Sequence, residues 1–263
     1  MGVTSGTDAA ALTARVEQQY GTIVVVGGGC YGSYYVRQLA RAVRAGAISA
    51  RAIVVVDRDP SCAVAVASDL ERPPALSVER SEWEPFFRSY LDRAAANPDS
   101  VVDDAIVPSP LMPHLMADWL LGRARDRWPT RSIVTAPLHT PPAVPWERAG
   151  EDGTHYVSFA EWMCPINCIE PARCPHTKGE RTWSMPPALA AYDDKERAAG
   201  RPVGGPLVFH CSHRAYGVGM IDVGDVVAAD VKIAALGAAG PLAVLIGTAS
   251  HCHGAIRRVE IGA

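Results

Sequence analysis

The sequence predicts an α/β fold, in which a doubly wound parallel sheet precedes a smaller α+β region rich in cysteine and histidine. Three observations support this prediction. Apolar, β-branched runs alternate with segments of helical periodicity from residue 22 to about residue 136. A glycine-rich hexapeptide follows the first of these runs, and three of the seven cysteines lie between positions 164 and 174.

The elements at the beginning of the chain have the clearest pattern. After a polar lead-in over residues 1–20, Thr22–Val26 is a continuous run typical of a strand buried on both faces. Residues 31–44 repeat apolar side chains at helical spacing, and Gly46 is a plausible stop. Ala52–Val56 is a second run of the buried-strand type.

The alternation then continues with less clarity. We expect helices over 62–70, 83–96 and 112–125, and strands near 76–78, 105–107 and 132–136. Strands that alternate with helices of this length indicate a parallel sheet covered on both faces. Four prolines between 137 and 145 then mark a boundary. They divide a dinucleotide-binding domain, 21–145, from a Cys/His-rich region, 146–263.

Charge and hydropathy limit the classes of partner. The 263 residues are 48% hydrophobic and 20% charged, and the net charge of -3 gives no reason to expect nucleic acid. The basic group between Arg123 and Arg131 is interrupted by Asp126 and is expected to form a solvated helix end. The longest apolar stretch, 226–249, contains Asp230 and Lys232 and is therefore expected to be core, without membrane insertion.

The compartment and the partners follow from the same features. Residues 1–13 have no secretory pattern, so cysteines crowded into one segment suggest ligation or redox chemistry in a reducing cytoplasm. The expected partner is a small-molecule substrate. A redox partner protein and a homo-oligomeric state are both compatible with the sequence.

The hexapeptide Gly27–Gly32 matches the pattern G-x-G-x-x-G between a strand and a helix. The first glycine permits a tight turn, the second lets the backbone approach a pyrophosphate, and the third lets the helix pack closely. The helix N-terminus would then hold the phosphates. The predicted cofactor-binding residues of the turn are Gly27, Gly28, Gly29, Cys30, Tyr31 and Gly32. The alternatives are a turn that only packs, and a Cys30 that is a small buried filler.

The second strand ends at Asp57, which lies 25 residues beyond Gly32. A carboxylate at this point can accept hydrogen bonds from both ribose hydroxyls of the adenosine half, which favours NAD. Arg58 keeps NADP open, because a guanidinium can bind a 2′-phosphate.

Residues 22–60, which end in Val56-Asp57-Arg58-Asp59-Pro60, resemble the NAD(P)-binding Rossmann superfamily. Within it they are most similar to the TrkA-type nucleotide-binding domains of potassium uptake systems. The resemblance covers about 40 residues. It implies a dinucleotide at Gly27, Gly29, Gly32 and Asp57, but it does not imply potassium transport. The Cys/His-rich second half departs from that family.

Cys164, Cys168 and Cys174 are spaced by four and six residues in a loop stiffened by prolines. This thiol density predicts a zinc ion or an iron–sulfur cluster. The spacing matches neither the common ferredoxin pattern nor the paired C-x2-C of a zinc ribbon, so the identity of the metal stays open. Cys211, at a predicted strand end, is the expected fourth ligand, with Cys252 as the reserve. The alternative is a set of buried or free thiols.

Two histidines are candidate catalytic residues. His213 lies in His210-Cys211-Ser212-His213, and a second such segment is His251-Cys252-His253. His114 follows the predicted strand at 105–107, at the sheet edge where ligands of α/β folds bind, and could face the nicotinamide. Its alternative role is a structural hydrogen bond at a helix N-terminus.

These features together predict an NAD(P)-dependent oxidoreductase with a Cys-ligated metal or iron–sulfur site and a small-molecule substrate. An imidazole would supply acid–base chemistry beside the cofactor. The alternatives are a non-catalytic NAD(H)- or redox-sensing regulatory protein related to TrkA-type domains, and a structural zinc that only holds a lid on the nucleotide-binding core.

Overall fold

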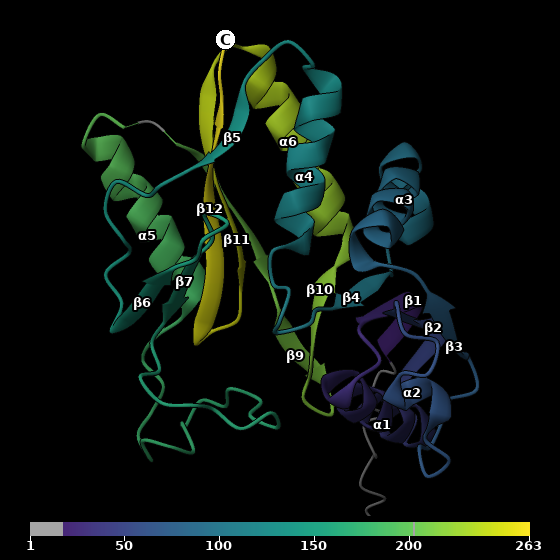
Figure 1. Ribbon diagram of the computed structural model, residues 1–263. Helices are drawn as coiled ribbons and strands as arrows, with labels where there is room; N and C mark the ends of the chain where they lie inside the picture. The colour runs from purple at the N-terminus through teal and green to yellow at the C-terminus, as the bar shows by residue number, and fades with distance from the viewer. Residues whose placement is uncertain (1–17, 202) are drawn as a thin grey trace, which may run out of the picture.

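Two β-sheets with helices on their faces form the structure, which is a computed structural model that describes residues 18–201 and 203–263 (Figure 1). The predicted α/β fold is therefore confirmed at this level. No helix among the described residues has the length and apolar character needed to cross a membrane.

The first sheet has the order β3-β2-β1-β4-β10-β9. Its strands are β1 (Gln18–Val26), β2 (Ile48–Asp57), β3 (Leu76–Arg80), β4 (Ala105–Val107), β9 (Ser212–Ala215) and β10 (Val218–Asp222). The first four are parallel, with Val24 opposite Val54 and Ile106, whereas β10 is antiparallel to β4 and to β9. The four predicted strands of this parallel group are confirmed.

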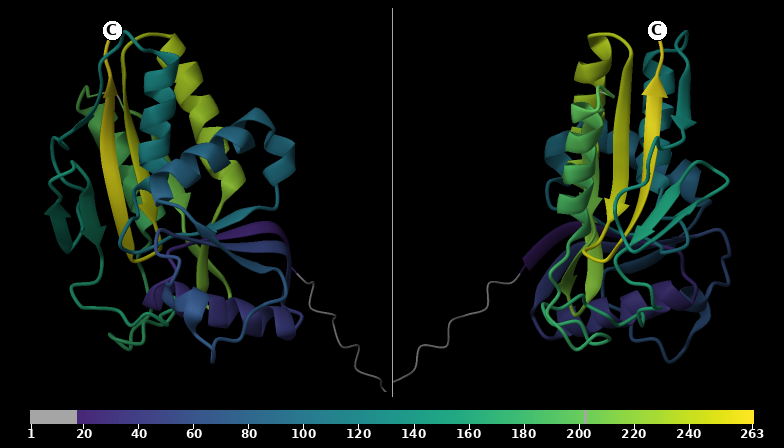
Figure 2. Two further views of the ribbon diagram at one scale, coloured as in Figure 1. Left: turned by 45° about the vertical axis from the view of Figure 1, so that its right-hand side comes forward. Right: turned by 90° about the vertical axis from the view of Figure 1, so that its left-hand side faces the viewer.

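Helices cover both faces of this sheet (Figures 1 and 2). They are α1 (Cys30–Arg44) and α2 (Ala63–Val66) on one face, and α3 (Trp83–Ala96), α4 (Leu115–Arg127) and α6 (Val223–Ala238) on the other. Because side chains alternate along a strand, Ile23 and Val25 pack toward α1, while Val24 and Val26 pack toward α3 and α4. This double burial explains the continuous apolar run in the sequence.

The second sheet has the order β6-β7-β12-β11-β8, and β5 also pairs with β12. Its strands are β5 (Ile133–Ala136), β6 (Trp146–Ala149), β7 (His155–Ser158), β8 (Gly204–His210), β11 (Leu242–Ala249) and β12 (His253–Ile261). Helix α5 (Met185–Ala198) covers one face through Met185 and Leu189, and the same core that contains α4 and α6 covers the other. A short 3₁₀ helix, Pro98–Val101, precedes β4.

The predicted boundary near residue 145 does not separate the two sheets. Strand β5, expected in the first sheet, pairs antiparallel with β12, and β9 and β10 from the later chain join the first sheet. The physical reason is a shared core: Ile106 of one sheet and Val244 of the other pack in one cluster with Leu120 and Ile233 of the helices between them.

Several local expectations also need correction. The helix expected over 62–70 is only α2, and the helix expected from residue 112 begins at Leu115. Residues 1–17 of the expected lead-in lie outside the described residues, and β1 already begins at Gln18. The expected solvated helix end is wrong, because Arg123 and Arg127 both donate to the buried Asp230 carboxylate of α6. The stretch 226–249 is core, as predicted.

Candidate functional site

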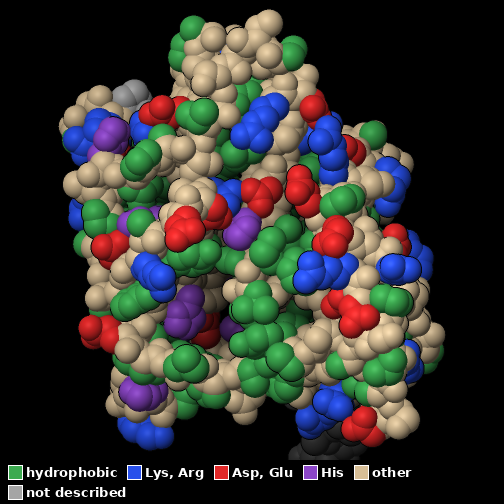
Figure 3. All heavy atoms as spheres, in the orientation of Figure 1, with side chains coloured by type: hydrophobic (Ala, Val, Ile, Leu, Met, Phe, Trp, Pro, Cys, Tyr) green, Lys and Arg blue, Asp and Glu red, His purple; other side chains and the backbone are tan. Residues whose placement is uncertain are grey.

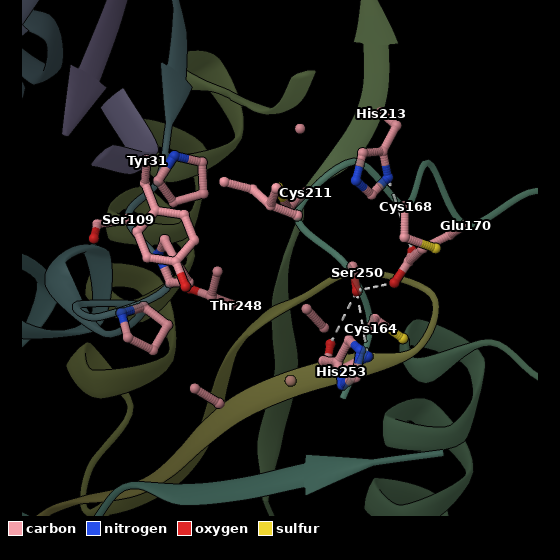
Figure 4. Close-up of a pocket in the computed structure, with 18 of the residues that line it drawn as sticks. Tyr31, Ser109, Cys164, Cys168, Glu170, Cys211, His213, Thr248, Ser250 and His253 are labelled. Carbon is pink, nitrogen blue, oxygen red and sulfur yellow. Dashed lines mark hydrogen bonds and ion pairs between the residues drawn. The ribbon is translucent and has the colours of Figure 1, made fainter. Parts of the chain in front are cut away.

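A cavity of about 410 Å³ lies where the two sheets meet. It forms there because β8 of the second sheet ends at His210 and β9 of the first sheet begins at Ser212, so the chain crosses between the sheets at Cys211. Figure 3 shows a hollow in this face of the molecule with histidine and acidic side chains inside it. In Figure 4, Tyr31 and Ser109 lie on one side of the cavity, with His213, Glu170 and His253 on the other.

The glycine turn adjoins the first of these walls. Gly27 has a φ of +84°, which L side chains rarely adopt. A Cβ at Gly32 would lie 1.9 Å from the Gly27 carbonyl oxygen, so the third glycine allows α1 to pack against the turn. A Cβ at Gly29 would meet no atom within 4 Å, and Gly29 is exposed at the N-cap of α1. The space beside the second glycine is therefore open.

Asp57, at the end of β2, is held by the same turn. Its Oδ2 accepts a hydrogen bond of 2.6 Å from the Gly28 N–H, and its Oδ1 accepts one of 2.9 Å from the Asp59 N–H. Each carboxylate oxygen has a second lone pair, so this carboxylate can still accept from a ligand hydroxyl. Arg58 beside it is exposed.

Two other residues of the predicted cofactor set lie at the start of α1. Cys30 is exposed, so it is not the buried filler considered above. Tyr31 lines the cavity together with Tyr35, one helical turn further on, and with Pro108 and Ser109, which follow β4. The cavity therefore begins at the N-terminus of α1 and at the carboxyl end of β4.

The predicted metal ligands fall into two groups. Cys164, Cys168 and Cys211 line the cavity. Cys174 does not; it is buried in its own turn, where hydrogen bonds from Thr177 and His176 lower the pKa of its thiol. The reserve ligand Cys252 is also outside the cavity wall, and its sulfur accepts a 3.3 Å hydrogen bond from the Trp183 indole.

This arrangement does not fit a zinc ion or an iron–sulfur cluster held by the four predicted thiols. Within 18–201 and 203–263, no three His, Cys, Asp or Glu side chains converge closely enough to hold a metal ion. Burial and the nearby Glu170 carboxylate raise the pKa of the Cys211 thiol to about 12. The metal site stays a prediction.

Glu170 is a central residue of the second wall and is absent from the predicted catalytic and metal-binding sets. Its carboxylate accepts hydrogen bonds from the Ser250 hydroxyl (2.6 Å) and from the backbone N–H groups of His251 (2.7 Å) and Cys252 (3.1 Å). Burial alone would raise its pKa, but these bonds outweigh burial and lower it. An ionised carboxylate therefore fixes the turn between β11 and β12 to the cysteine-containing loop.

The four histidines of the two Cys/His segments separate into two pairs. His213 and His253 line the cavity, and His213 Nδ1 lies 4.0 Å from Glu170 Oε2. His210 and His251 lie outside the cavity wall, with ring centroids 4.9 Å apart. Burial lowers the pKa of all four rings, so they are mostly neutral near pH 7. The structure thus brings the predicted His213 to the cavity, together with His253.

His114 is not brought there. Its Nε2 lies 3.6 Å from Asp118 Oδ2 and its Nδ1 lies 4.0 Å from Asp152 Oδ2, beside the buried Arg257 that binds both carboxylates. His114 is the N-cap residue of α4, but its side chain makes no capping hydrogen bond, so the expected structural hydrogen bond is not seen among the described residues either; the ring lies beside the ion pairs of Arg257, outside the cavity lining.

A family model matches residues 116–262 of the chain; its description is AF_1314_C, uncharacterized protein, C-terminal domain. The chain belongs to this family. The AF_1314_C match begins within α4 and includes the second sheet, β9, β10 and the whole Cys/His wall, whereas the glycine turn precedes it. No curated protein and no solved structure matches the chain.

Proposed function

We propose that this protein is an NAD(P)-dependent oxidoreductase that binds NAD(H) on the turn Gly27–Gly32 and transfers hydride to or from a small molecule in the cavity. The observation that carries the proposal is the position of the cavity. It adjoins the N-terminus of α1 at the carboxyl edge of the parallel strands β3-β2-β1-β4. Nucleotide-binding halves of the Rossmann type bind their ligand at such an edge, which supports the proposal.

The residues of the turn suit a pyrophosphate. Gly29 leaves open space, and the first turn of α1 has neither an acidic residue nor a side-chain cap that would compete with an anion for its free N–H groups. Asp57 would receive the ribose hydroxyls, which favours NAD over NADP, while the exposed Arg58 keeps NADP open.

Bound dinucleotide would supply a hydride acceptor or donor. The chain's own residues would then orient the substrate and move a proton. For an alcohol substrate, a neutral imidazole, His213 or His253, would accept the O–H proton while the alcohol is converted to a carbonyl compound by the hydride chemistry of the dinucleotide. The apolar side chains of Tyr35, Pro108 and Ile166 in the cavity lining would limit the access of water.

A matched pair of glycine substitutions tests the proposal. Gly29→Ala adds a methyl group that meets no protein atom but occupies the pyrophosphate space, and Gly122→Ala adds one that is equally free of contacts in α4. We expect Gly29→Ala to weaken NADH binding at least tenfold by calorimetry and Gly122→Ala to leave it unchanged. Equal affinities in both variants, or a wild-type protein that binds neither NADH nor NADPH, would refute the dinucleotide site.

Turnover separates the enzyme from the non-catalytic sensor, which would use the same dinucleotide site. Oxidation of NADH in the presence of ketones and aldehydes, or reduction of NAD⁺ in the presence of alcohols, supports the enzyme. Tight NADH binding with no turnover on any of these compounds supports the sensor.

A further inference from the structure

His253 has an orientation in the cavity that a hydrogen bond fixes. Its Nδ1 lies 2.9 Å from the hydroxyl oxygen of Ser158, the residue opposite it where β12 pairs with β7. Ser158 is buried, so no solvent competes for this contact. The ring is thus anchored on one edge while His253 lines the cavity.

The bonds around Ser158 determine the tautomer of this ring. The Ser158 hydroxyl oxygen lies 2.8 Å from the carbonyl oxygen of Ala160 and 2.9 Å from the backbone nitrogen of the same residue. A hydroxyl has one hydrogen, and a carbonyl can only accept, so the hydrogen belongs to the bond with the Ala160 carbonyl. His253 Nδ1–H must then donate to Ser158.

The consequence is a hydrogen-bond acceptor that faces the ligand space. With the hydrogen on Nδ1, the neutral His253 ring carries its lone pair on Nε2. Nε2 has no hydrogen-bond partner in the part of the chain that the structure describes, and it is the ring nitrogen left for the cavity. A ligand that donates a hydrogen bond would satisfy it.

The charges of the lining exclude one class of ligand. Among the described residues, no lysine or arginine lines the cavity. The acidic residue in its wall, Glu170, already accepts bonds from the turn between β11 and β12. A carboxylate or phosphate on the ligand would lose its hydration without gaining a cationic partner, and it would lie near a negative charge.

The rim of the cavity is apolar. Met163 and Ile166 line the cavity and are 95% and 44% exposed, and Leu111, between the lining residues Pro110 and Pro113, is 69% exposed. Large apolar side chains that are exposed beside a cavity favour contact with an apolar body. The lining therefore combines an apolar entrance with the oriented acceptor of His253.

We infer that the cavity binds an uncharged, largely apolar alcohol whose hydroxyl donates to His253 Nε2, with Ser158 as the positioning residue. Because this ligand is the substrate class of the proposed function, the inference rests on that function. Its two structural claims, the tautomer and the ligand charge, can nevertheless be measured without dinucleotide.

The tautomer is tested by nitrogen NMR of the imidazole rings at a pH where they are neutral. We expect His253 to carry its hydrogen on Nδ1 and to lose this preference in Ser158→Ala. Ser184→Ala is the matched control, because Ser184 contacts His251 Nδ1 at the same 2.9 Å but His251 lies outside the cavity wall. It should leave the His253 tautomer unchanged. A hydrogen on Nε2 of His253, or no response to Ser158→Ala, would overturn the assignment.

The ligand class is tested with cyclohexanol, its methyl ether and cyclohexanecarboxylate, observed through the His253 ring signals. We expect cyclohexanol to bind at least tenfold more tightly than the carboxylate and several-fold more tightly than the ether. Ser158→Ala should reduce the difference between alcohol and ether, and Ser184→Ala should not. Equal or tighter binding of the carboxylate, or no binding of any probe, would overturn the ligand class.

These results and those for the dinucleotide are distinguishable. NADH binding that depends on Gly29, together with a cavity that prefers the carboxylate, would keep the proposed function and remove the alcohol. Alcohol binding at His253 in a protein that binds no dinucleotide would keep the recognition of the alcohol and remove hydride transfer.

Discussion

The turn at Gly27–Gly32, which reaches the cavity through Tyr31, is a surface made mainly of backbone, whereas the opposite wall presents side chains from three distant segments. The first surface is made by six consecutive residues and has free N–H groups and open space. The second combines the loop that contains Glu170, the crossing at Cys211 and the turn at Ser250. A backbone surface suits a common cofactor, since any sequence with these glycines can form it. A side-chain surface can differ between proteins and therefore determines which substrate is bound.

The largest effect that we expect is a loss of stability on substitution of Gly32 in the glycine turn, compared with no such loss for Gly29 in the same turn. Gly32→Ala places a methyl group 1.9 Å from the Gly27 carbonyl oxygen, and neither backbone can yield without moving α1 from β1. We expect a loss of about 3 kcal/mol in the free energy of unfolding, measured by urea denaturation. Gly29→Ala and Gly122→Ala, which meet no atom, are the controls. A Gly32→Ala protein as stable as these controls would show that the turn is not packed as described.

The different origins of the two surfaces explain how much the sequence could predict. The strand β1, the glycine turn and Asp57 all lie within one β-α-β unit. Their positions can therefore be predicted from local patterns, namely β-branched runs and the spacing of glycines. The bond between Ser158 and His253 joins residues 95 positions apart, and that between Glu170 and Ser250 joins residues 80 apart. No periodicity in the sequence encodes such pairs.

The cysteine cluster shows that spacing along the chain does not determine which thiols line one cavity. Cys164 and Cys168 line it, whereas Cys174 lies outside the lining and accepts hydrogen bonds from Thr177 and His176 of its own turn. Likewise, the four prolines after β5 mark a long loop but no boundary between sheets, because β12 pairs with both β5 and β7.

The second prediction is that a change in the Cys/His wall at Glu170 does not affect dinucleotide binding at the glycine turn. Glu170→Gln replaces one carboxylate oxygen by an NH₂ group that would face a backbone N–H of His251 or Cys252. We expect it to lower the free energy of unfolding by about 2 kcal/mol, since a buried donor loses its partner. NADH affinity should stay within twofold of wild type. Glu161→Gln, at an exposed residue of the same loop, is the control. A large loss of NADH affinity in Glu170→Gln would mean that the two walls are coupled.

The third prediction is a pH dependence that arises in the second wall. Burial lowers the folded-state pKa of His210, His213, His251 and His253 below the value of roughly 6.5 expected in the unfolded chain. The unfolded state therefore binds more protons as the pH falls below about 7, and stability must fall with it. Each proton taken up contributes a slope of about 1.4 kcal/mol per pH unit. Glu170, whose pKa is lowered, adds a separate loss below about pH 4.5.

Urea denaturation at a series of pH values between 8 and 5 measures this slope. His213→Asn should reduce this slope by up to about 1.4 kcal/mol per pH unit, the contribution of one proton. A stability that is independent of pH over this range would contradict the burial of these rings in a neutral form.

The smallest effect that we expect is that of Asp57→Asn. It tests whether the Asp57 carboxylate binds a ligand or only holds the glycine turn. Asp57→Asn keeps an oxygen that can accept from the Gly28 N–H and loses only the exposed bond from the Asp59 N–H, where water can replace it, so stability should change by less than about 1 kcal/mol. It removes the negative charge and one acceptor, so NADH affinity should fall several-fold, and NADPH, which carries an extra phosphate, should lose less. Asp59→Asn is the control, because Asp59 is exposed and accepts only from the Ser61 N–H. Competition of NADH and NADPH in both variants measures the difference. If Asp57→Asn lowers stability but leaves NADH affinity unchanged, then this carboxylate only holds the glycine turn, and recognition of the ribose must come from elsewhere in the first wall.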